Sequence, residues 1–98
     1  MTGMLFAWDK TRVQPVILSM PGSPHGYIPL FHSVHLLEEA MTRVGASFDS
    51  IKQVENGEEF YASLRENAPN EHGGQIKVIQ DLIFLPDGRV RFIETKEN

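Results

Sequence analysis

Hydrophobic residues recur along this chain with two periods, one typical of strands and the other typical of a helix. Short apolar runs that are rich in β-branched and aromatic residues predict strands. These runs cover Met4–Trp8, Arg12–Met20, Tyr27–Phe31, Phe48–Val54, Ile76–Leu85 and Arg89–Thr95. After the third run, apolar residues at spacings of three and four predict a helix over Val34–Val44.

The residue types at both ends of this helix predict its limits. Ser33 is a good N-cap, because its hydroxyl can accept a hydrogen bond from the first turn. Gly45 is a natural stop. Glu38 and Glu39 are expected to face solvent. The buried stripe is expected to consist of Val34, Leu37, Met41 and Val44, widened by Leu36 and Ala40.

A second helix is expected after the strand Phe48–Val54. Asn56 followed by Glu59 matches a capping box, so the helix should begin there. It should run to about Asn67, because Pro69 stops any continuation. The side chains expected to face inward are Phe60, Tyr61 and Leu64.

Prolines and a turn signal indicate how the strands pair. Pro15 lacks an N–H, so its strand should start there or lie at a sheet edge, and Pro29 should place its strand at an edge or interrupt the ladder. The Pro-Asp-Gly sequence at 86–88 predicts the turn of a terminal hairpin. One face of the return strand should be buried, because apolar and basic residues alternate along Arg89, Val90, Arg91 and Phe92.

The elements follow one another in the order β-β-β-α-β-α-β-β. Interspersed strands and helices with a terminal hairpin predict an α+β fold. We expect a mixed, mainly antiparallel sheet with two helices packed mainly on one face. The 98 residues contain no internal repeat and no linker, which predicts a single domain over residues 1–98.

Charge and cysteine content narrow the classes of partner and location. The 13 acidic and 9 basic residues give a net charge of −4, and Lys and Arg do not cluster, so nucleic-acid binding is not expected. The chain has no cysteine, which excludes disulfides and thiol catalysis and fits a cytoplasmic location. No apolar run approaches the roughly 20 residues of a membrane span. The first residues do not resemble a signal peptide either, so no membrane association is expected.

Three histidines near the predicted helix start are the first candidates for chemistry. Together with Tyr27, the residues His25, His32 and His35 define a face that could bind a small molecule or a metal. However, His32 and His35 do not share a helix face as two ligands four residues apart would. A polar, half-exposed position near a helix start explains each of them as well, and no cofactor is expected.

Ser33 and Asp81 are the other candidates. Ser33 lies beside His32, but no Gly-x-Ser-x-Gly motif surrounds it and helix capping explains it, so an enzyme is not favoured. Asp81 interrupts an apolar strand, and two interpretations stay open. It is an outward polar position, or an acid paired across the hairpin with Arg89 or Arg91.

One family resemblance rests on the segment YIPLFHS at 27–33, followed by a helix with Leu36, Leu37 and Met41. The segment resembles the N-terminal domain of the serine-sensitivity-enhancing SseB proteins, in which a strand runs into a capped helix and a second strand and helix follow. The resemblance covers about residues 17–64 and does not extend to the terminal hairpin. It implies a bacterial α/β module without known catalysis, and it carries over no catalytic residues.

These features predict a non-catalytic bacterial module for protein interaction or regulation that acts as a homodimer. Proline-marked strands offer edges through which two copies can pair. Trp8 and Tyr27 are expected to be core residues first and interface anchors second. The alternative is a small-molecule or metal-binding protein that uses the face of His25, His32 and His35.

Overall fold

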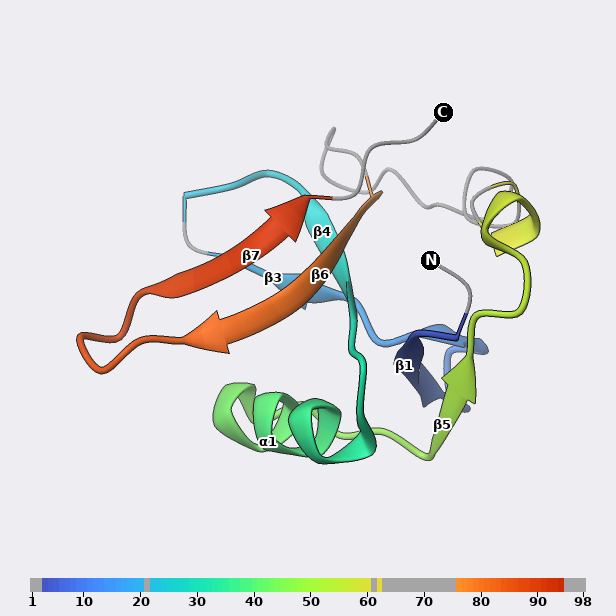
Figure 1. Cartoon of the computed structure of the whole chain (residues 1–98), viewed down its shortest axis with the longest axis horizontal. Coiled ribbons are helices and arrows are strands. Elements are labelled where there is room, and N and C mark those ends of the chain that lie inside the picture. The colour runs from blue at the N-terminus through green and yellow to red at the C-terminus, as the bar shows by residue number, and fades with distance from the viewer. Residues whose placement is uncertain (1–2, 21, 61, 63–75, 95–98) are drawn as a thin grey trace.

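The computed structural model describes residues 3–20, 22–60, 62 and 76–94, and it shows an α+β fold, as predicted (Figure 1). A helical turn at 57–60 opens the second helix, so the order of strands and helices agrees with the sequence. The named elements are β1 (Leu5–Asp9), β2 (Gln14–Pro15), β3 (Leu18–Ser19), β4 (Gly26–Leu30), α1 (Val34–Val44), β5 (Ser50–Gln53), β6 (Ile76–Phe84) and β7 (Val90–Glu94). No described helix has the length and apolar character needed to cross a membrane.

The described strands form two sheets, one antiparallel and the other mixed. One sheet has the order β2-β1-β5, and the other has the order β3-β4-β6-β7. Strands β4 and β6 pair in parallel, whereas the other described pairs are antiparallel. Among the described residues, one isolated bridge joins the sheets: Leu5 and Phe31 exchange two backbone hydrogen bonds of 2.7 and 2.8 Å.

The predicted strand Arg12–Met20 is divided between the two sheets, as β2 and β3. Pro15 lies in the edge strand β2, as predicted. Pro29 lies in the internal strand β4, but the ladder from β3 reaches only as far as Tyr27. The missing N–H of Pro29 therefore coincides with an interrupted ladder, which is the second of the two predicted outcomes.

The first helix has the predicted limits. Ser33 Oγ accepts a hydrogen bond of 3.2 Å from the N–H of Leu36, and Gly45 closes the helix with a φ of 69°. Only the middle of the predicted stripe is buried, through Leu37, Ala40 and Met41. The predicted burial of Val34, Leu36 and Val44 is wrong: the helix rests on the sheets at its centre, and these three side chains stay exposed.

Two hydrophobic cores cover opposite faces of the same strands. The first core includes Ala7, Tyr27 and Ile79, and α1 packs into it through Leu37, Ala40 and Met41. The second core includes Phe6, Ile28 and Val78, each the chain neighbour of one of those three strand residues. Phe60 from the second helix packs against this core. Alternate side chains point to opposite faces of a strand, so β1, β4 and β6 each contribute to both cores.

The two helices consequently lie on opposite faces of β1, which corrects the expectation that both pack mainly on one face (Figure 1). Both faces of β1 are apolar, through Phe6 and Ala7, and each face needs its own cover. Asn56 caps the second helix as predicted, because its Oδ1 accepts from the N–H groups of Glu58 (2.9 Å) and Glu59 (3.2 Å). The predicted end of this helix, with Tyr61 and Leu64, lies outside the described residues.

The terminal hairpin is present as predicted. Strand β6 pairs with β7, and Val90 and Phe92 are half-buried while Arg91 is exposed. The sequence did not predict the register shift between Gln80 and Ile83. Asp81, inside that shift, has a φ of 55°, which is unusual for a residue other than glycine. A β-bulge of this kind re-aims a side chain.

Candidate functional site

The bulge in β6 brings Asp81 to a histidine from the start of α1. His32 Nδ1 and Asp81 Oδ1 are 2.8 Å apart. The side chain of His32 is 63% exposed, and that of Asp81 is 35% exposed. The carboxylate therefore orients the ring through one nitrogen and leaves the other, Nε2, without a hydrogen bond to any described residue.

This pair changes the interpretation of the sequence candidates around it. Asp81 pairs with His32 instead of with Arg89 or Arg91. Arg89 Nε is 2.6 Å from Asp87 Oδ2 within the hairpin turn, and Arg91 is exposed. Ser33 Oγ is occupied as the helix cap. Among the described residues, the His32–Asp81 pair therefore has an orienting acid and a base but no nucleophile in hydrogen-bond contact.

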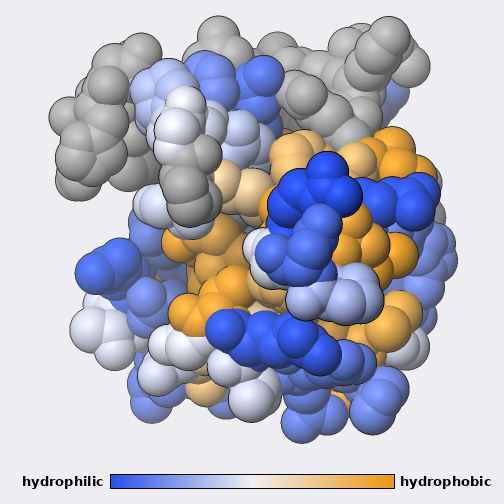
Figure 2. Space-filling model, turned by 90° about the vertical axis from the view of Figure 1, so that its left-hand side faces the viewer, coloured by the Kyte–Doolittle hydropathy of each residue, from blue (hydrophilic) through white to orange (hydrophobic). Residues whose placement is uncertain are grey.

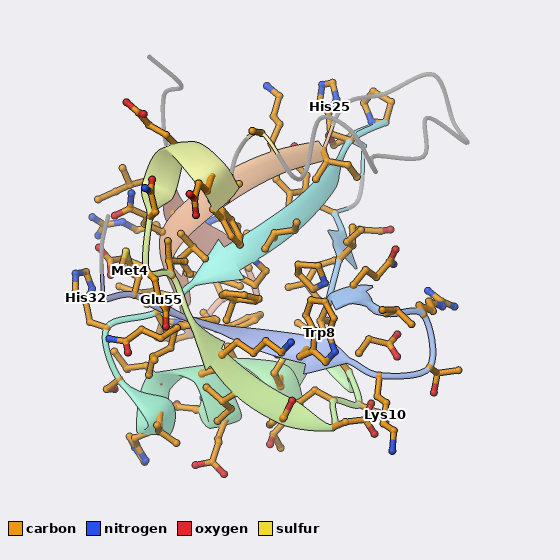
Figure 3. The ribbon with its side chains drawn as sticks, turned by 90° about the vertical axis from the view of Figure 1, so that its right-hand side faces the viewer. Met4, Trp8, Lys10, His25, His32 and Glu55 are labelled. Carbon is orange, nitrogen blue, oxygen red and sulfur yellow. The ribbon has the colours of Figure 1, made fainter. Side chains whose placement is uncertain are left out.

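The other histidines have separate surroundings. His25 and His32 lie well apart, with His25 at the top and His32 at the left-hand side of Figure 3. The His25 ring meets the buried Tyr27 ring edge-on at 6.4 Å. His35 Nε2 is 4.0 Å from Glu39 Oε2, one turn along α1. Within the part of the chain that is described, no group of three or more His, Asp or Glu side chains could hold a metal ion.

A hollow of about 790 Å³ lies elsewhere, against the second core, and we call it the aromatic groove. Its floor consists of the buried side chains of Phe6, Ile28 and Val54, from β1, β4 and the end of β5. Its walls are half-buried side chains from five segments: Trp8, Pro15, Ile17, Phe60 and Ile76. Its volume lies within the range of known binding pockets, and its lining combines an apolar floor with polar and charged side chains.

An aromatic row runs along the groove. The Phe6 ring lies 6.5 Å from Trp8 at a steep angle and 5.0 Å from Phe60. Lys52 extends from β5 opposite Phe6 and places its Nζ 3.7 Å from the centre of the Trp8 ring. This cation–π contact holds a positive charge at the mouth of the groove.

The described lining of the groove carries charges of both signs. Lys52 lies over the Trp8 ring, and Arg12, Glu55 and Glu59 also line the groove, with Glu59 next to Phe60 in the chain. Figure 3 shows Trp8 and Glu55 on different sides of this region, on strand β1 and just after strand β5. All four charged side chains belong to exposed residues. The groove thus has an apolar floor, a cation over Trp8 and a carboxylate, that of Glu55, on another side.

Sequence reasoning found only one residue of this site. Trp8 was interpreted as a core residue first and an interface anchor second, and it is half-buried and lines the groove. Its alternation with Phe6 across Ala7 was a signal that both rings share a face. No local signal marked Lys52, because its position over Trp8 depends on the pairing of β1 with β5.

Comparison with known proteins gives no relative: no family model, curated protein or solved structure matches this chain.

Proposed function

We propose that this chain is a non-catalytic module that acts by binding another protein, and that the aromatic groove is its binding site. The observation that carries this proposal is the half-exposed Trp8, which lies under Lys52 and lines a groove with an apolar floor. Tryptophan, tyrosine and arginine dominate the binding energy of protein interfaces. A large aromatic ring left partly in water is stabilised further when a partner covers it.

The composition of the groove supports binding over catalysis. Its described lining contains no His, Ser, Thr, Tyr or Cys. Its carboxylates, Glu55 and Glu59, are exposed at the rim. General acid–base catalysis works through a carboxyl group that burial or a neighbour has tuned. An apolar floor with exposed charges at the rim has the anatomy of a protein interface.

Quantitative pull-down with immobilised protein tests the proposal. Three versions are compared: wild type, Trp8→Ala, and Leu36→Ala as a control at an exposed position of α1 outside the groove lining. We expect specific partners to be lost from Trp8→Ala and kept by Leu36→Ala, with both variants showing the wild-type circular dichroism spectrum. Equal recovery of every partner by the two variants would overturn the role of the groove.

We also propose that the chain self-associates through the outer edge of β7. No described strand pairs with that edge. Ile93 in β7 and Ile83 in β6 are 60% and 52% exposed. Figure 2 shows hydrophobic surface interspersed with hydrophilic residues on the side to which the hairpin turn points. Edge strands with exposed apolar side chains favour strand pairing between copies.

Light scattering coupled to size-exclusion chromatography tests self-association. A dimer has twice the 11.1 kDa mass of the chain. The substitution Ile93→Lys should return the protein to the monomer, because it places a charge in the pairing edge. A wild-type monomer at high protein concentration removes this proposal and leaves the groove unaffected.

Two further expectations stay proposals. The relation to the SseB N-terminal domain rests on the segment at 27–33 and its helix. A cytoplasmic location is supported by the absence of cysteine. The absence of clustered Lys and Arg supports a protein partner over nucleic acid.

A further inference from the structure

We propose that the aromatic groove binds an extended peptide segment in a single orientation. An acidic side chain of the segment lies at the Trp8–Lys52 end, apolar side chains cover Phe6, and a basic side chain lies at the Glu55–Glu59 end. This inference rests on the proposed function and specifies the chemistry of the partner. The inference is based on the charged residues that line the groove, on its apolar floor and on the strained residue Val13.

The cations at one end are available to a ligand. The described contact of Lys52 Nζ is the face of the Trp8 ring, and no described carboxylate pairs with it. Arg12 Nε is 3.9 Å from Asp9 Oδ2, and the Arg12 side chain is 75% exposed, so this ion pair is loose. An incoming carboxylate can therefore pair with Lys52 without breaking a strong contact.

The carboxylates at the other end are available too. The backbone N–H groups of residues 58 and 59 are bound by Asn56, so Glu59 is fixed in the first turn of the second helix. Neither the Glu55 nor the Glu59 carboxylate forms an ion pair with a described residue. A basic side chain of the ligand gains an attractive contact here and a repulsive one beside Lys52. This difference selects one orientation of the segment.

The floor between the charged ends fits apolar side chains. Phe6 lies between Trp8 and Phe60 in the aromatic row, and Ile28 behind it is fully buried. Side chains of an extended peptide point alternately to the groove and to solvent, so alternate residues should provide the apolar contacts.

Val13 on the rim supports a binding role. Its φ is 55°, a left-handed conformation that β-branched residues rarely adopt, and it is 73% exposed. It lines the groove beside Arg12. The strained backbone of Val13 is therefore not offset by burial of its side chain among the described residues. A strained and exposed apolar residue beside a groove is expected where a ligand makes contact.

Peptide display provides the test, because Trp8 is the only tryptophan of the chain and its emission reports groove occupancy directly. A random peptide library is selected on wild-type protein, and the enriched peptides are synthesised. Titration of each peptide, followed by Trp8 emission, gives its Kd. We expect the enriched peptides to carry an acidic and a basic residue on opposite sides of an apolar pair.

Charge reversal sharpens the test. Lys52→Glu should weaken the enriched peptides about tenfold, as removal of an interfacial charge pair does. A peptide whose acidic residue is replaced by lysine should recover that loss on the variant. Lys10→Glu is the matched control: Lys10 is exposed in the loop after β1, outside the groove lining, and the variant should bind as wild type does (Figure 3).

Each contrary result has a separate meaning. Enriched peptides that quench Trp8 but show no charge bias overturn the orientation and leave groove binding in place. Peptides that bind equally well to Trp8→Ala, measured by calorimetry, overturn the proposed function as well. A response to octanoate as tight as the response to the best peptide overturns the peptide as the ligand class.

Discussion

Asp81 and His32 are separated by 49 positions in the chain, yet Oδ1 and Nδ1 lie 2.8 Å apart. The contact joins the bulge of β6 to the residue that precedes the N-cap of α1. The positive φ of Asp81 belongs to a conformation that aspartate tolerates better than most residues. One residue therefore provides both the backbone geometry and the carboxylate.

The two contributions of Asp81 can be separated by substitution. Asp81→Ala should lower the free energy of unfolding by about 2 kcal/mol, because it removes a hydrogen bond and replaces aspartate with a residue that tolerates the left-handed region less well. Asp81→Gly should lower the free energy of unfolding by only about 1 kcal/mol, since glycine adopts this φ without strain. Asp81→Asn should stay closest to wild type. Urea unfolding measures all three, and a larger loss for glycine than for alanine would contradict this assignment.

Val13 should be replaceable with a gain in stability. Val13→Asn and Val13→Gly are expected to raise the free energy of unfolding by about 1 kcal/mol, because both residues tolerate a positive φ. Little burial is lost, since the valine is 73% exposed. Val13→Ala keeps the unfavourable φ and should leave stability nearly unchanged. If Val13→Asn also weakens peptide binding, the strained residue has the role at the rim that we propose.

Gly26 is constrained by space. A β-carbon at this position would lie 2.7 Å from Ile17 Cγ2 and 3.1 Å from Ile76 Cδ1. Gly26→Ala should therefore cost about 1–3 kcal/mol, the usual range for overpacking. The double variant Gly26→Ala/Ile17→Ala removes the clashing methyl group and should be more stable than the sum of the two single effects. Simple additivity in thermal unfolding would show that Ile17 is not the obstacle.

Ser33 should stabilise α1 through its hydroxyl group alone. Its Oγ accepts the 3.2 Å hydrogen bond from Leu36 N–H, and Ser33→Ala should cost about 1 kcal/mol of stability. Ser33→Asn, a comparable cap, should restore it. Helical circular dichroism during urea unfolding provides the measurement. If alanine and asparagine behave alike, the cap does not stabilise α1.

Local signals predicted the local parts of this fold. The caps Ser33, Gly45 and Asn56 act within a few residues of themselves, and their predicted roles are confirmed. The hairpin turn at 86–88 is local in the same way. The exposed ends of α1 were missed because their burial depends on how far the sheets extend beneath the helix, which a helical period does not encode.

Contacts between distant segments could not be predicted. The division of the strands into two sheets depends on the pairing of β4 with β6 across the middle of the chain. The Lys52–Trp8 contact depends on the pairing of β5 with β1, and the His32–Asp81 contact depends on a bulge. The alternation in β1 already indicated that Phe6 and Trp8 share one face. The residue that lies opposite these two rings, Lys52 on β5, could be identified only from the structure.

The shared strands of the two cores have a consequence for unfolding. Val78 and Ile79 are neighbours in β6 but belong to different cores, and Tyr27 and Ile28 divide in the same way in β4. If either core opens, these strands lose the cover of one face and their pairing weakens. The molecule should therefore melt in one cooperative transition, with Trp8 emission and helical circular dichroism changing at the same temperature.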